Sequence, residues 1–441
     1  MPATPLAYRC LTALGSALLP LAARAGRKIR EGHAGRLAAP EMLRRWAVAH
    51  RRPDRPLVWF HASSVGEGLQ AESVLRALRA LHPDAQYAYT HFSPSAQPLA
   101  RRVPADIAGY VPYDRPAAVA AALDALAPDL LVFSKLDLWP ELATAAAARG
   151  VTVAMVAATV SPGSGRLGWP ARALLHAGYG AVAAAGAVAE DDAERLARLG
   201  VRRERIRVLG DPRFDSVIER VGAVLPDDPL LRLGRGSPAL VAGSTWAPDE
   251  AVLLDAFAVV RAAHPGARLI LVPHEPTDAH LAAVERQAAS AGLPPPVRLS
   301  AADGPVPLLL VDRVGVLAAL YGAGAMAYVG GGFGRAGLHS VLEPAAWGLP
   351  VAFGPRWRES RDAGLLLAAG AAVAVRDGAA LGGCWLRWIE EEARREAEGQ
   401  RAKAVVEAGR GAARRSAELL AGLIGSRPLR TSPTGAPPIP R

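Results

Sequence analysis

The sequence predicts an α/β protein made of two Rossmann-like domains that face a cleft. Its 441 residues are too many for a single ordinary hydrophobic core. Short apolar stretches alternate with helical stretches in two successive halves, which is typical of parallel sheets covered by helices on both faces. The stretch Gly210–Pro238 between the halves is rich in proline, glycine and charged residues, which indicates a linker.

Each half contains six expected strands, separated by stretches with apolar residues at helical spacing. In the first half the strands are Leu57–His61, Gln86–Thr90, Asp129–Phe133, Val151–Ala158, Ala181–Ala185 and Ile206–Leu209, and the helices between them include Leu69–Leu81, Ala117–Leu126, Glu141–Arg149 and Ala189–Leu199. In the second half the strands are Ala239–Ala242, Arg268–Val272, Pro307–Val311, Ala325–Val329, Pro350–Phe353 and Ala371–Val375.

The expected domain boundaries follow from these changes in pattern. They are 1–55 for a basic membrane-associating segment, 56–210 for the first domain, 211–238 for the linker, 239–385 for the second domain, 386–425 for a C-terminal helical segment and 426–441 for a tail. The tail is expected to be disordered because it is rich in proline.

The formal net charge of +10 is concentrated at the two ends of the chain. Residues 1–55 hold eleven lysines and arginines against three acidic residues, a net charge of +8, and residues 426–441 add +3. The body, residues 56–425, therefore carries −1. Because this body shows no basic groove interleaved with aromatic residues, we expect no nucleic-acid partner. The basic N-terminal end indicates contact with an anionic surface.

An apolar run, Leu11–Ala23, lies just before most of these basic residues. Its 13 residues, interrupted by Gly15 and Pro20, are fewer than the roughly 20 that span a bilayer. Basic residues follow it at once, which does not fit a cleaved signal peptide. They are Arg24, Arg27, Lys28 and Arg30. We expect an interfacial anchor on anionic lipid; the alternative is an ordinary core helix whose basic residues face water.

Disulfide and metal chemistry have little support in the sequence. Cys10 and Cys384 are the only cysteines, so neither a disulfide framework nor a cysteine-rich zinc site is expected. No H-E-x-x-H pattern or cluster of aspartates and histidines indicates another metal site. We therefore expect a protein that requires no metal.

The first candidate site directly follows an expected strand. It reads His61-Ala-Ser-Ser-Val-Gly-Glu67, and Glu67 lies near the start of the next helix. A carboxylate there can be stabilised by the helix N-terminus or can act as a general base, and the spacing leaves both readings open. Ser63 or Ser64 is expected to cap the helix rather than to pair with His61 as a nucleophile, because no G-x-S-x-G elbow is present.

The second candidate site reads Lys135-Leu-Asp-Leu-Trp-Pro-Glu141 and follows the strand expected at Asp129–Phe133. Lys135, Asp137 and Trp139 would place a cation, an acid and an aromatic ring at the mouth of the cleft. The residues alone slightly favour a salt bridge packed by the tryptophan over a substrate contact.

The third candidate site is the glycine-rich stretch Gly330–Pro344 (GGGFGRAGLHSVLEP). Its glycines let the backbone approach a ligand, and a helix expected to begin near Leu338 would direct free N–H groups at a phosphate. Its polar members are Arg335, His339, Ser340 and Glu343, of which Glu343 can accept hydrogen bonds from ribose hydroxyls one turn further in. The spacing matches neither G-x-G-x-x-G nor a Walker loop. A glycine-rich turn without a ligand is the alternative.

The fourth candidate site combines Pro273-His-Glu-Pro276 with Gly243–Glu250, which includes Ser244. Both stretches follow expected strands of the second half, where ligands of such sheets bind. His274 taken alone is more often structural than a ligand contact.

Taken together, these motifs resemble those of the 3-deoxy-D-manno-octulosonic acid (Kdo) transferases, a family of GT-B glycosyltransferases. His61–Glu67 resembles the family signature H-A-x-S-x-G-E, and Gly210–Asp215 (GDPRFD) is similar to G-D/N-x-[KR]-F-D. Gly330–Pro344 resembles the run G-G-x…G-x-H-N-x-L-E-P, and Gly354-Pro355 resembles the G-P that follows it. The resemblance covers roughly residues 8–375, and several motifs in the same order make it specific.

Three departures from the family pattern stand out. Lys135–Pro140 reads K-L-D-L-W-P where E-T-E-L-W-P is common; with the G-G-G-F-G turn at 330–334 and P-H-E at 273–275, it resembles a divergent branch. P-H-E replaces the more usual P-R-H, so the base-contacting arginine is absent. His339-Ser340 replaces H-N, which shortens an amide to a hydroxyl at the expected phosphate.

The resemblance implies inverting transfer of Kdo from CMP-Kdo to a lipid A precursor (lipid IVA) in lipopolysaccharide core biosynthesis, at the cytoplasmic face of the inner membrane. It assigns residues 56–210 to the acceptor and 239–385 to the CMP-sugar, with Glu67 as the catalytic base. The donor-binding residues that it implies are Pro273, His274, Gly315, Val316, Leu317, Ser340, Val341, Leu342 and Glu343. Candidate contacts to acceptor or donor are Ser64, Lys135, Asp137, Ser244, Arg335 and His339. CMP is a good leaving group, so neither a metal nor another cofactor is expected.

Two alternatives remain open at this point. One is a GT-B enzyme that uses another nucleotide sugar, which heat protection by CMP rather than by UDP or GDP would exclude. The other is a catalytically silent, membrane-bound nucleotide or glycolipid binder, suggested by the missing arginine and asparagine. The presence of Glu67 speaks against the silent binder.

Overall fold

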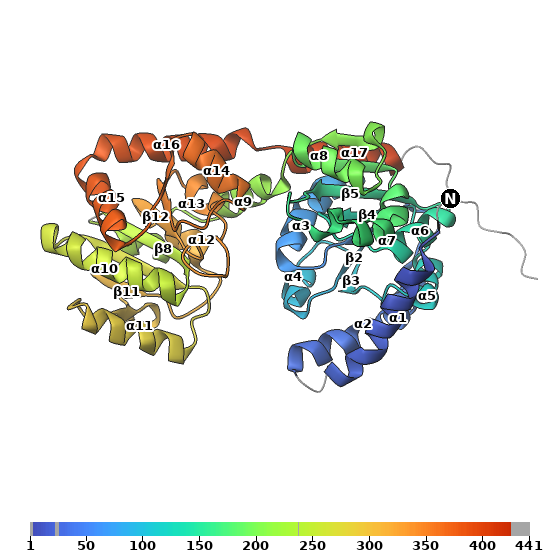
Figure 1. Ribbon diagram of the computed structural model, residues 1–441, viewed down its shortest axis with the longest axis horizontal. Coiled ribbons are helices and arrows are strands. Elements are labelled where there is room, and N and C mark those ends of the chain that lie inside the picture. Colours follow the sequence, from blue (N-terminus) through green and yellow to red (C-terminus); the bar gives the residue numbers. More distant parts are fainter. Residues whose placement is uncertain (1–2, 23–25, 237, 425–441) are drawn as a thin grey trace, which may run out of the picture. The chain divides into compact units, whose positions relative to one another are not determined.

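A computed structural model describes residues 3–22, 26–236 and 238–424, which form two compact units (Figure 1). Unit 1 comprises Met1–Ser216 and Gly411–Arg441, and unit 2 comprises Val217–Arg410. Unit 2 is therefore inserted into the sequence of unit 1. The expected succession of two domains differs from this division because the last helix of the chain returns to unit 1.

Unit 1 is built around a seven-stranded parallel sheet with the order β3-β2-β1-β4-β5-β6-β7. Successive side chains of a strand point to opposite faces, so Trp59 and Phe133 belong to one core and Phe60 and Val132 to the other. The strands are β1 (Leu57–His61), β2 (Gln86–His91), β3 (Ile107–Tyr110), β4 (Leu130–Ser134), β5 (Thr152–Ala158), β6 (Ala184–Ala187) and β7 (Ile206–Val208).

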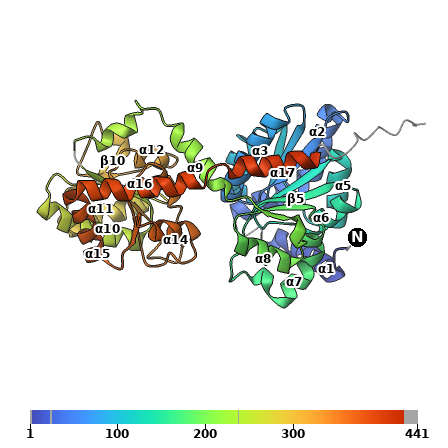
Figure 2. The same cartoon turned by 90° about the horizontal axis from the view of Figure 1, so that it is seen from above.

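Helices cover both faces of this sheet, and Figure 2 shows the last helix of the chain beside α3. One core includes side chains from α3 (Val65–Leu81), α4 (Gln97–Ala100) and α17 (Ala412–Ile424). The other core includes side chains from α2 (Arg27–His50), α5 (Pro116–Leu126), α6 (Pro140–Ala148) and α8 (Glu190–Leu199). The remaining helices are α1 (Leu6–Ala22), α7 (Trp169–Gly180) and α9 (Pro212–Gly222), which crosses into unit 2.

Unit 2 repeats the arrangement with the order β10-β11-β9-β8-β12-β13-β14, again all parallel. Its strands are β8 (Ala239–Thr245), β9 (Arg268–Pro273), β10 (Val297–Arg298), β11 (Leu308–Leu310), β12 (Met326–Val329), β13 (Val351–Phe353) and β14 (Ala372–Ala374). Its helices are α10 (Ala247–Ala263), α11 (Asp278–Ser290), α12 (Leu317–Tyr321), α13 (Leu342–Ala346), α14 (Arg361–Ala368), α15 (Gly378–Glu390) and α16 (Glu392–Ala408). The side chains of α10, α11 and α15 fill one core and those of α12 the other.

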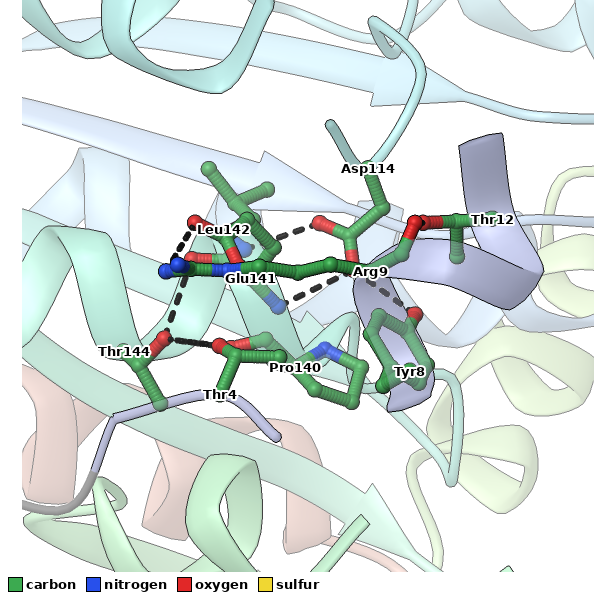
Figure 3. A network of polar contacts seen from close by, with 9 residues as sticks. All are labelled: Thr4, Tyr8, Arg9, Thr12, Asp114, Pro140, Glu141, Leu142 and Thr144. Atoms are coloured by element: carbon green, nitrogen blue, oxygen red, sulfur yellow. Dashed lines mark hydrogen bonds and ion pairs between the residues drawn. The ribbon is translucent and has the colours of Figure 1, made fainter. Parts of the chain in front are cut away.

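The N-terminal helices are packed onto unit 1 rather than forming the separate segment expected for residues 1–55. Leu43 of α2 is fully buried in the core. The start of the chain is bonded to α6 and to Asp114 (Figure 3): Tyr8 Oη donates to Asp114 Oδ2 over 2.7 Å, and Arg9 Nε donates to Glu141 Oε2 over 2.8 Å. Helix α2 therefore shares the hydrophobic core of the domain that was predicted to begin at residue 56.

The other side of α1 is apolar and open to solvent. Leu11, Leu14 and Leu18 are 56%, 60% and 53% exposed. Within the described residues, no helix is both long and apolar enough to cross a bilayer.

The segments predicted as a linker and as a C-terminal helical stretch also differ from expectation. The predicted linker, 211–238, contains helix α9 and the 3₁₀ turn Pro229–Gly234. The predicted stretch 386–425 is divided between the units, since α16 lies in unit 2 and α17 in unit 1. Asp215 Oδ1 and Oδ2 accept from the backbone N–H groups of Gly411 and Ala413 over 2.6 and 2.8 Å. The predicted tail, 426–441, lies outside the described residues.

Candidate active site

The candidate residues lie beside the two points where the strand order reverses. In unit 1 the reversal lies between β1 and β4, and in unit 2 between β8 and β12. Ligands of open parallel sheets bind outside the carboxyl ends of the strands at such points. Glu67 follows β1 and Asp137 follows β4, whereas Ser244 and Gly330 lie at the ends of β8 and β12.

Glu67 closes the first turn of α3. Its Oε2 accepts from the backbone N–H of Ser64 over 3.0 Å, and Ser64 Oγ accepts from the backbone N–H of Glu67 over 3.5 Å, which is a capping box. The expected capping role of Ser64 is confirmed. Glu67 is thus a carboxylate at a helix N-terminus, as one of the two interpretations predicted, and its carboxyl group also interacts with Asp137.

Asp137 is held from several sides. It hydrogen-bonds to Glu67 and Ser63, and Arg166 Nη2 donates to its Oδ1 over 3.1 Å. Arg166 Nη1 also donates to the carbonyl of Leu136 over 2.5 Å, so the arginine fixes the loop as well as the carboxylate. Asp137 thus forms a salt bridge, but its partner among the described residues is Arg166 rather than Lys135, the cation of the motif. No sequence pattern marked Arg166, because it lies in a loop after β5 that carries no motif.

The two carboxyl groups have opposite pKa shifts. Burial raises the pKa of Glu67, and the neighbouring charge of Asp137 raises it further, while Lys135 and Ser64 oppose the shift. Burial also acts to raise the pKa of Asp137, but its hydrogen bonds to Ser63, Arg166 and Glu67 lower the pKa overall. A proton that enters the pair therefore resides on Glu67. A carboxyl group with a raised pKa is a better general base near neutral pH than an ordinary one.

His61 is the last residue of β1, and its ring is not available as a base. Burial lowers the pKa of His61 to about 4, so the ring is neutral at pH 7. Trp139 Nε1 donates to His61 Nε2 over 2.8 Å, which leaves the ring proton on Nδ1, 3.1 Å from Thr90 Oγ1. Ser63 Oγ also lies 3.2 Å from His61 Nε2, but Trp139 engages the lone pair of that nitrogen, so His61 cannot act as the base of a serine nucleophile. Trp139 packs the site as predicted.

Lys135 directly follows β4 with a left-handed backbone, φ 61°. Ser244 has φ 53° at an irregularity in the pairing of β8 with β9. A non-glycine residue in this region costs on the order of 1–3 kcal/mol, and such strain is concentrated at functional sites. Lys135 also acts to lower the pKa of Glu67, so its cationic charge favours the basic form of that carboxylate.

The glycine-rich stretch forms a tight turn after β12. Gly331 has φ 94°, and its backbone N–H donates to the buried Asp249 Oδ2 over 2.9 Å. A Cβ added to Gly332 would lie 2.6 Å from the backbone nitrogen of Gly354. The close approach that the glycines were predicted to permit is therefore made to the Gly354-Pro355 loop of the same unit.

The helix after this turn begins later than expected. It starts at Leu342 rather than near Leu338, and α13 has only five residues. Ser340 Oγ accepts from the backbone N–H of Leu342 over 3.4 Å, and Glu343 lies in the first turn rather than one turn further in. Free N–H groups of a long helix thus do not face the turn, which removes the physical basis of the predicted helix-end phosphate site.

Three rings line the end of the glycine turn. His274 and His339 stack with centroids 4.5 Å apart, and Trp246 Nε1 donates to His339 Nε2 over 3.1 Å. Burial lowers the pKa of His339, and His274 lowers it further. The predicted contacts His274 and His339 therefore lie together, with the latter kept neutral and its Nε2 lone pair engaged by Trp246.

Glu343 has an ion-pair partner that the sequence did not indicate. Arg220 Nη1 of α9 pairs with Glu343 Oε1. Burial raises the pKa of Glu343, and Arg220 opposes the shift. A carboxylate has about four lone-pair positions, so Glu343 can accept from a ribose hydroxyl while it remains paired with Arg220.

The remaining predicted positions fall in three places of unit 2. Gly315, Val316 and Leu317 form the turn into α12, where Gly315 has φ 86°. Val341 and Leu342 are buried beneath the glycine turn, whereas Arg335 and Ser340 are exposed on it. Pro273 ends β9 and is buried.

In the described parts of the chain, no three His, Cys, Asp or Glu residues are grouped so that they could hold a metal ion.

Comparison with solved structures agrees with this architecture. The chain superposes on the UDP-GlcNAc 2-epimerase of Neisseria meningitidis with a TM-score of 0.60 and 12% identity, covering 85% of this chain and all of that one. A glycosyltransferase from Rickettsia africae gives a TM-score of 0.56 with 11% identity, over 85% of this chain and 100% of that one. The fold, with its two parallel sheets, is that of a GT-B glycosyltransferase.

Sequence comparison identifies the family. A family model described as 3-deoxy-D-manno-octulosonic-acid transferase (kdotransferase) matches residues 40–216. The 3-deoxy-D-manno-octulosonic acid transferase of Bordetella pertussis is 31% identical over 415 residues, which cover 90% of this chain and 94% of that protein. That of Haemophilus influenzae is 25% identical over 310 residues, 67% and 70% of the two chains. The chain belongs to the Kdo transferase family, and the resemblance seen in the motifs is confirmed.

Proposed function

We propose that this transferase moves Kdo from CMP-Kdo to a sugar hydroxyl of a lipid A precursor, with inversion at the transferred carbon. The observation that carries the proposal is the Glu67–Asp137 carboxyl pair at the strand-order reversal of unit 1. A single displacement with inversion requires one base at the acceptor hydroxyl and no covalent sugar–enzyme intermediate. Membership of the Kdo transferase family supports the choice of donor.

In the proposed step, Glu67 acts as a carboxylate and takes the proton of the acceptor hydroxyl. The hydroxyl oxygen forms a bond to the anomeric carbon of Kdo as the bond from that carbon to the phosphate oxygen breaks. CMP then leaves as a phosphate monoester, which is a stable leaving group. The step uses no metal ion, and Lys135 favours the carboxylate form of Glu67 by its charge.

The donor is assigned to unit 2. Beside the glycine turn that follows β12, the His274–His339 stack supplies flat rings and Glu343 supplies a hydrogen-bond acceptor. These groups suit a nucleotide that carries one phosphate and a ribose. The absent arginine and asparagine of the family pattern make the two histidines and the backbone the main polar groups at this place.

The acceptor carries acyl chains, so the enzyme is proposed to act at the cytoplasmic face of the inner membrane. The exposed leucines of α1 and the basic residues of α2 offer an apolar face with nearby positive charge. Such a surface suits interfacial binding to anionic lipid.

The direct test is transfer of radiolabelled Kdo to a tetraacylated lipid A precursor in the presence of a CMP-Kdo-generating system. Transfer that continues in excess chelator would support the metal-free step. CMP should protect the protein against heat, whereas UDP and GDP should not. Protection by UDP instead would favour another nucleotide-sugar donor, and CMP binding without transfer would favour a silent binder.

A further inference from the structure

A basic cavity of about 300 Å³ lies at the amino ends of the strands of the unit 1 sheet, on the side opposite to the Glu67–Asp137 pair. Its polar lining comes from His50, Arg52, Arg55, Arg79 and Asp106, with Trp46 as an aromatic wall. It also includes Gln86, the first residue of β2, and therefore lies at the amino ends of the parallel strands. Glu67 and Asp137 follow carboxyl ends, so the cavity is not part of the candidate active site.

The charges around the cavity do not balance. The acid Asp106 is engaged, because its Oδ2 accepts from the backbone N–H of Tyr87 over 2.7 Å and its Oδ1 lies 3.9 Å from Arg79 Nη2. Within the described part of the chain, the side chains of Arg52 and Arg55 have no hydrogen bond or ion pair. Two guanidinium groups are thus left to face the cavity.

Hydrogen bonds from buried polar groups hold the loop that carries these two arginines. Arg51 is largely buried and donates to the carbonyls of Leu126 and Arg55 over 2.9 and 2.7 Å. The buried Gln86 accepts from the backbone N–H of Arg52 over 2.8 Å and donates to the carbonyl of His50 over 2.8 Å. The backbone of the loop is therefore fixed by buried polar groups, which preorganises the position of Arg52 and Arg55.

The aromatic wall gives the cavity a mixed character. Trp46 and His50 stack with centroids 6.1 Å apart and an interplanar angle of 17°. A cavity of about 300 Å³ lies at the lower end of the range for small-molecule sites. Guanidinium groups match the geometry of phosphate oxygens through paired hydrogen bonds. The cavity thus suits a phosphate together with a small organic carrier.

We propose that this cavity binds a phosphate group, free or carried by the headgroup of an anionic phospholipid, at a site separate from the transfer reaction. Arg52 and Arg55 contact the phosphate oxygens, and Trp46 with His50 contacts the carrier. Because the cavity lies apart from the carboxyl pair, the proposal does not depend on the transfer reaction. Glu67→Gln should therefore leave this binding unchanged.

The test uses the full chain and two double variants. Arg52→Gln with Arg55→Gln removes the unpaired charges of the cavity. Arg198→Gln with Arg207→Gln removes the same charge from exposed positions elsewhere in unit 1 and serves as the matched control. Calorimetry with inorganic phosphate and with glycerol 3-phosphate measures the site, and sedimentation with phosphatidylcholine vesicles, with or without phosphatidylglycerol, measures lipid binding. Circular dichroism establishes that both variants are folded.

The cavity variant should weaken glycerol 3-phosphate binding by at least about tenfold, as expected for lost charge-assisted hydrogen bonds, while the control variant binds as the parent does. Loss of binding to phosphatidylglycerol vesicles in the cavity variant alone would assign the phosphate to a lipid headgroup. Unchanged vesicle binding with lost glycerol 3-phosphate binding would assign it to a soluble phosphate. The proposal is overturned if the parent protein binds neither phosphate probe, or if both double variants weaken binding equally.

Discussion

At the scale of single residues, Glu67 and Asp137 titrate as a pair in which the proton resides on Glu67. The anchored member is Asp137, which Arg166 and Ser63 keep ionised. The member proposed to react is Glu67, whose pKa is raised first by burial and then by the charge of Asp137. Asp137 is therefore a positioning residue in the proposed reaction, and its contribution can be separated from that of Glu67 by the pH dependence of the rate.

We expect Asp137→Asn to move the acidic limb of the rate profile to lower pH. The base must be deprotonated to act, so activity is lost as the pH falls through the pKa of Glu67. Removing the charge of Asp137 lowers that pKa, while burial continues to raise it. The profile of kcat against pH measures the shift. An acidic limb that stays in place or moves upward would show that Asp137 does not act through Glu67.

Glu67→Gln should reduce kcat by about a hundredfold to ten-thousandfold, the usual contribution of a positioned base. Glutamine can still accept from the backbone N–H of Ser64, so the capping box and the fold should persist. CMP affinity should not change, because the nucleotide is assigned to unit 2. Glu194→Gln, an exposed change in the same unit, is the control. Near-normal turnover of Glu67→Gln at saturating substrate would reduce Glu67 to a helix cap and make Asp137 the next candidate base.

At the scale of elements, α1 is joined to α6 through a buried polar network rather than through apolar contacts alone. Asp114 accepts from Tyr8 Oη and from the backbone N–H groups of Glu141 and Leu142, at 2.7, 3.0 and 2.8 Å. Burial raises the pKa of Asp114 to about 6, although all three hydrogen bonds oppose the shift. Deleting the N-terminal residues would therefore remove the Tyr8 hydrogen bond from Asp114 and the Arg9 ion pair from Glu141, and would disturb the fold as well as the proposed membrane contact.

Tyr8→Phe should destabilise unit 1 by about 1.5–3 kcal/mol where Asp114 is ionised and by about 1 kcal/mol where it is protonated. Because the pKa of Asp114 is raised in the folded state, this carboxyl group contributes most to the stability of the fold at low pH, and the contribution is lost as the pH rises through about 6. The hydrogen bond from the Tyr8 phenol stabilises the ionised carboxylate and so offsets part of that loss. The free energy of unfolding of Tyr8→Phe should therefore lie furthest below that of the parent above this pH. Urea unfolding on both sides of it measures the difference. Thr12→Ala, on the same helix, should change stability little, since Thr12 bonds only to the carbonyl of Arg9. Equal losses at both pH values would contradict the assignment.

The glycine turn permits an equally direct test. Gly332→Ala places a Cβ 2.6 Å from the backbone of Gly354 and should cost about 1–3 kcal/mol of stability, with weaker CMP binding. Gly334→Ala lies two residues away in the same turn, where the nearest atom is 3.9 Å from the added Cβ, and should be tolerated. Thermal unfolding and CMP calorimetry compare the two. Similar behaviour of both variants would show that the backbone approach at Gly332 does not shape the turn.

The elements that could be predicted from the sequence are those with a continuous apolar stretch. All twelve expected strands are present with boundaries within three residues. The two strands that were missed, β3 and β10, lie at sheet edges; β3 contains Gly109, and β10 has only two residues. Edge strands are half exposed and short, so they carry a weak apolar signal. The helix misplaced at Leu338 shows the same limit, because the backbone of the turn is fixed by Asp249, which lies far away in the sequence.

The candidate site could be predicted where a motif follows a strand. Glu67, Asp137, His274 and His339 all lie where the alternation placed them, at the carboxyl ends of strands. Arg166, the partner of Asp137, and Arg220, the partner of Glu343, could not be predicted, since each comes from a segment without a motif and reaches the site only through the fold. A family resemblance therefore locates the reacting groups more readily than the charges that tune them.

At the scale of the whole molecule, the exposed leucines of α1 are proposed to contact the membrane. Leu14→Ser with Leu18→Ser should shift the protein from membrane to soluble fractions without loss of stability, because both side chains are more than half exposed. Leu225→Ser with Leu365→Ser, exposed leucines of unit 2, is the control. High salt should release only part of the parent protein, since salt screens the basic residues but not apolar burial. Parent protein found wholly in the soluble fraction at low salt would contradict the proposal.

The motif Gly210–Asp215 joins the two places where the chain passes between the units. Asp215 lies just before the first passage and accepts from the backbone N–H groups of Gly411 and Ala413, where the chain comes back. The segment 217–410 thus leaves and re-enters unit 1 at neighbouring points, as the ends of an inserted domain often do. The segment can therefore be exchanged as one unit, because a single carboxylate holds its two junctions with unit 1 together. Since the donor is assigned to unit 2, exchanging this segment between two members of the family should give the host the CMP affinity of the member that supplied the segment, while the host keeps its own acceptor; calorimetry with CMP measures the change.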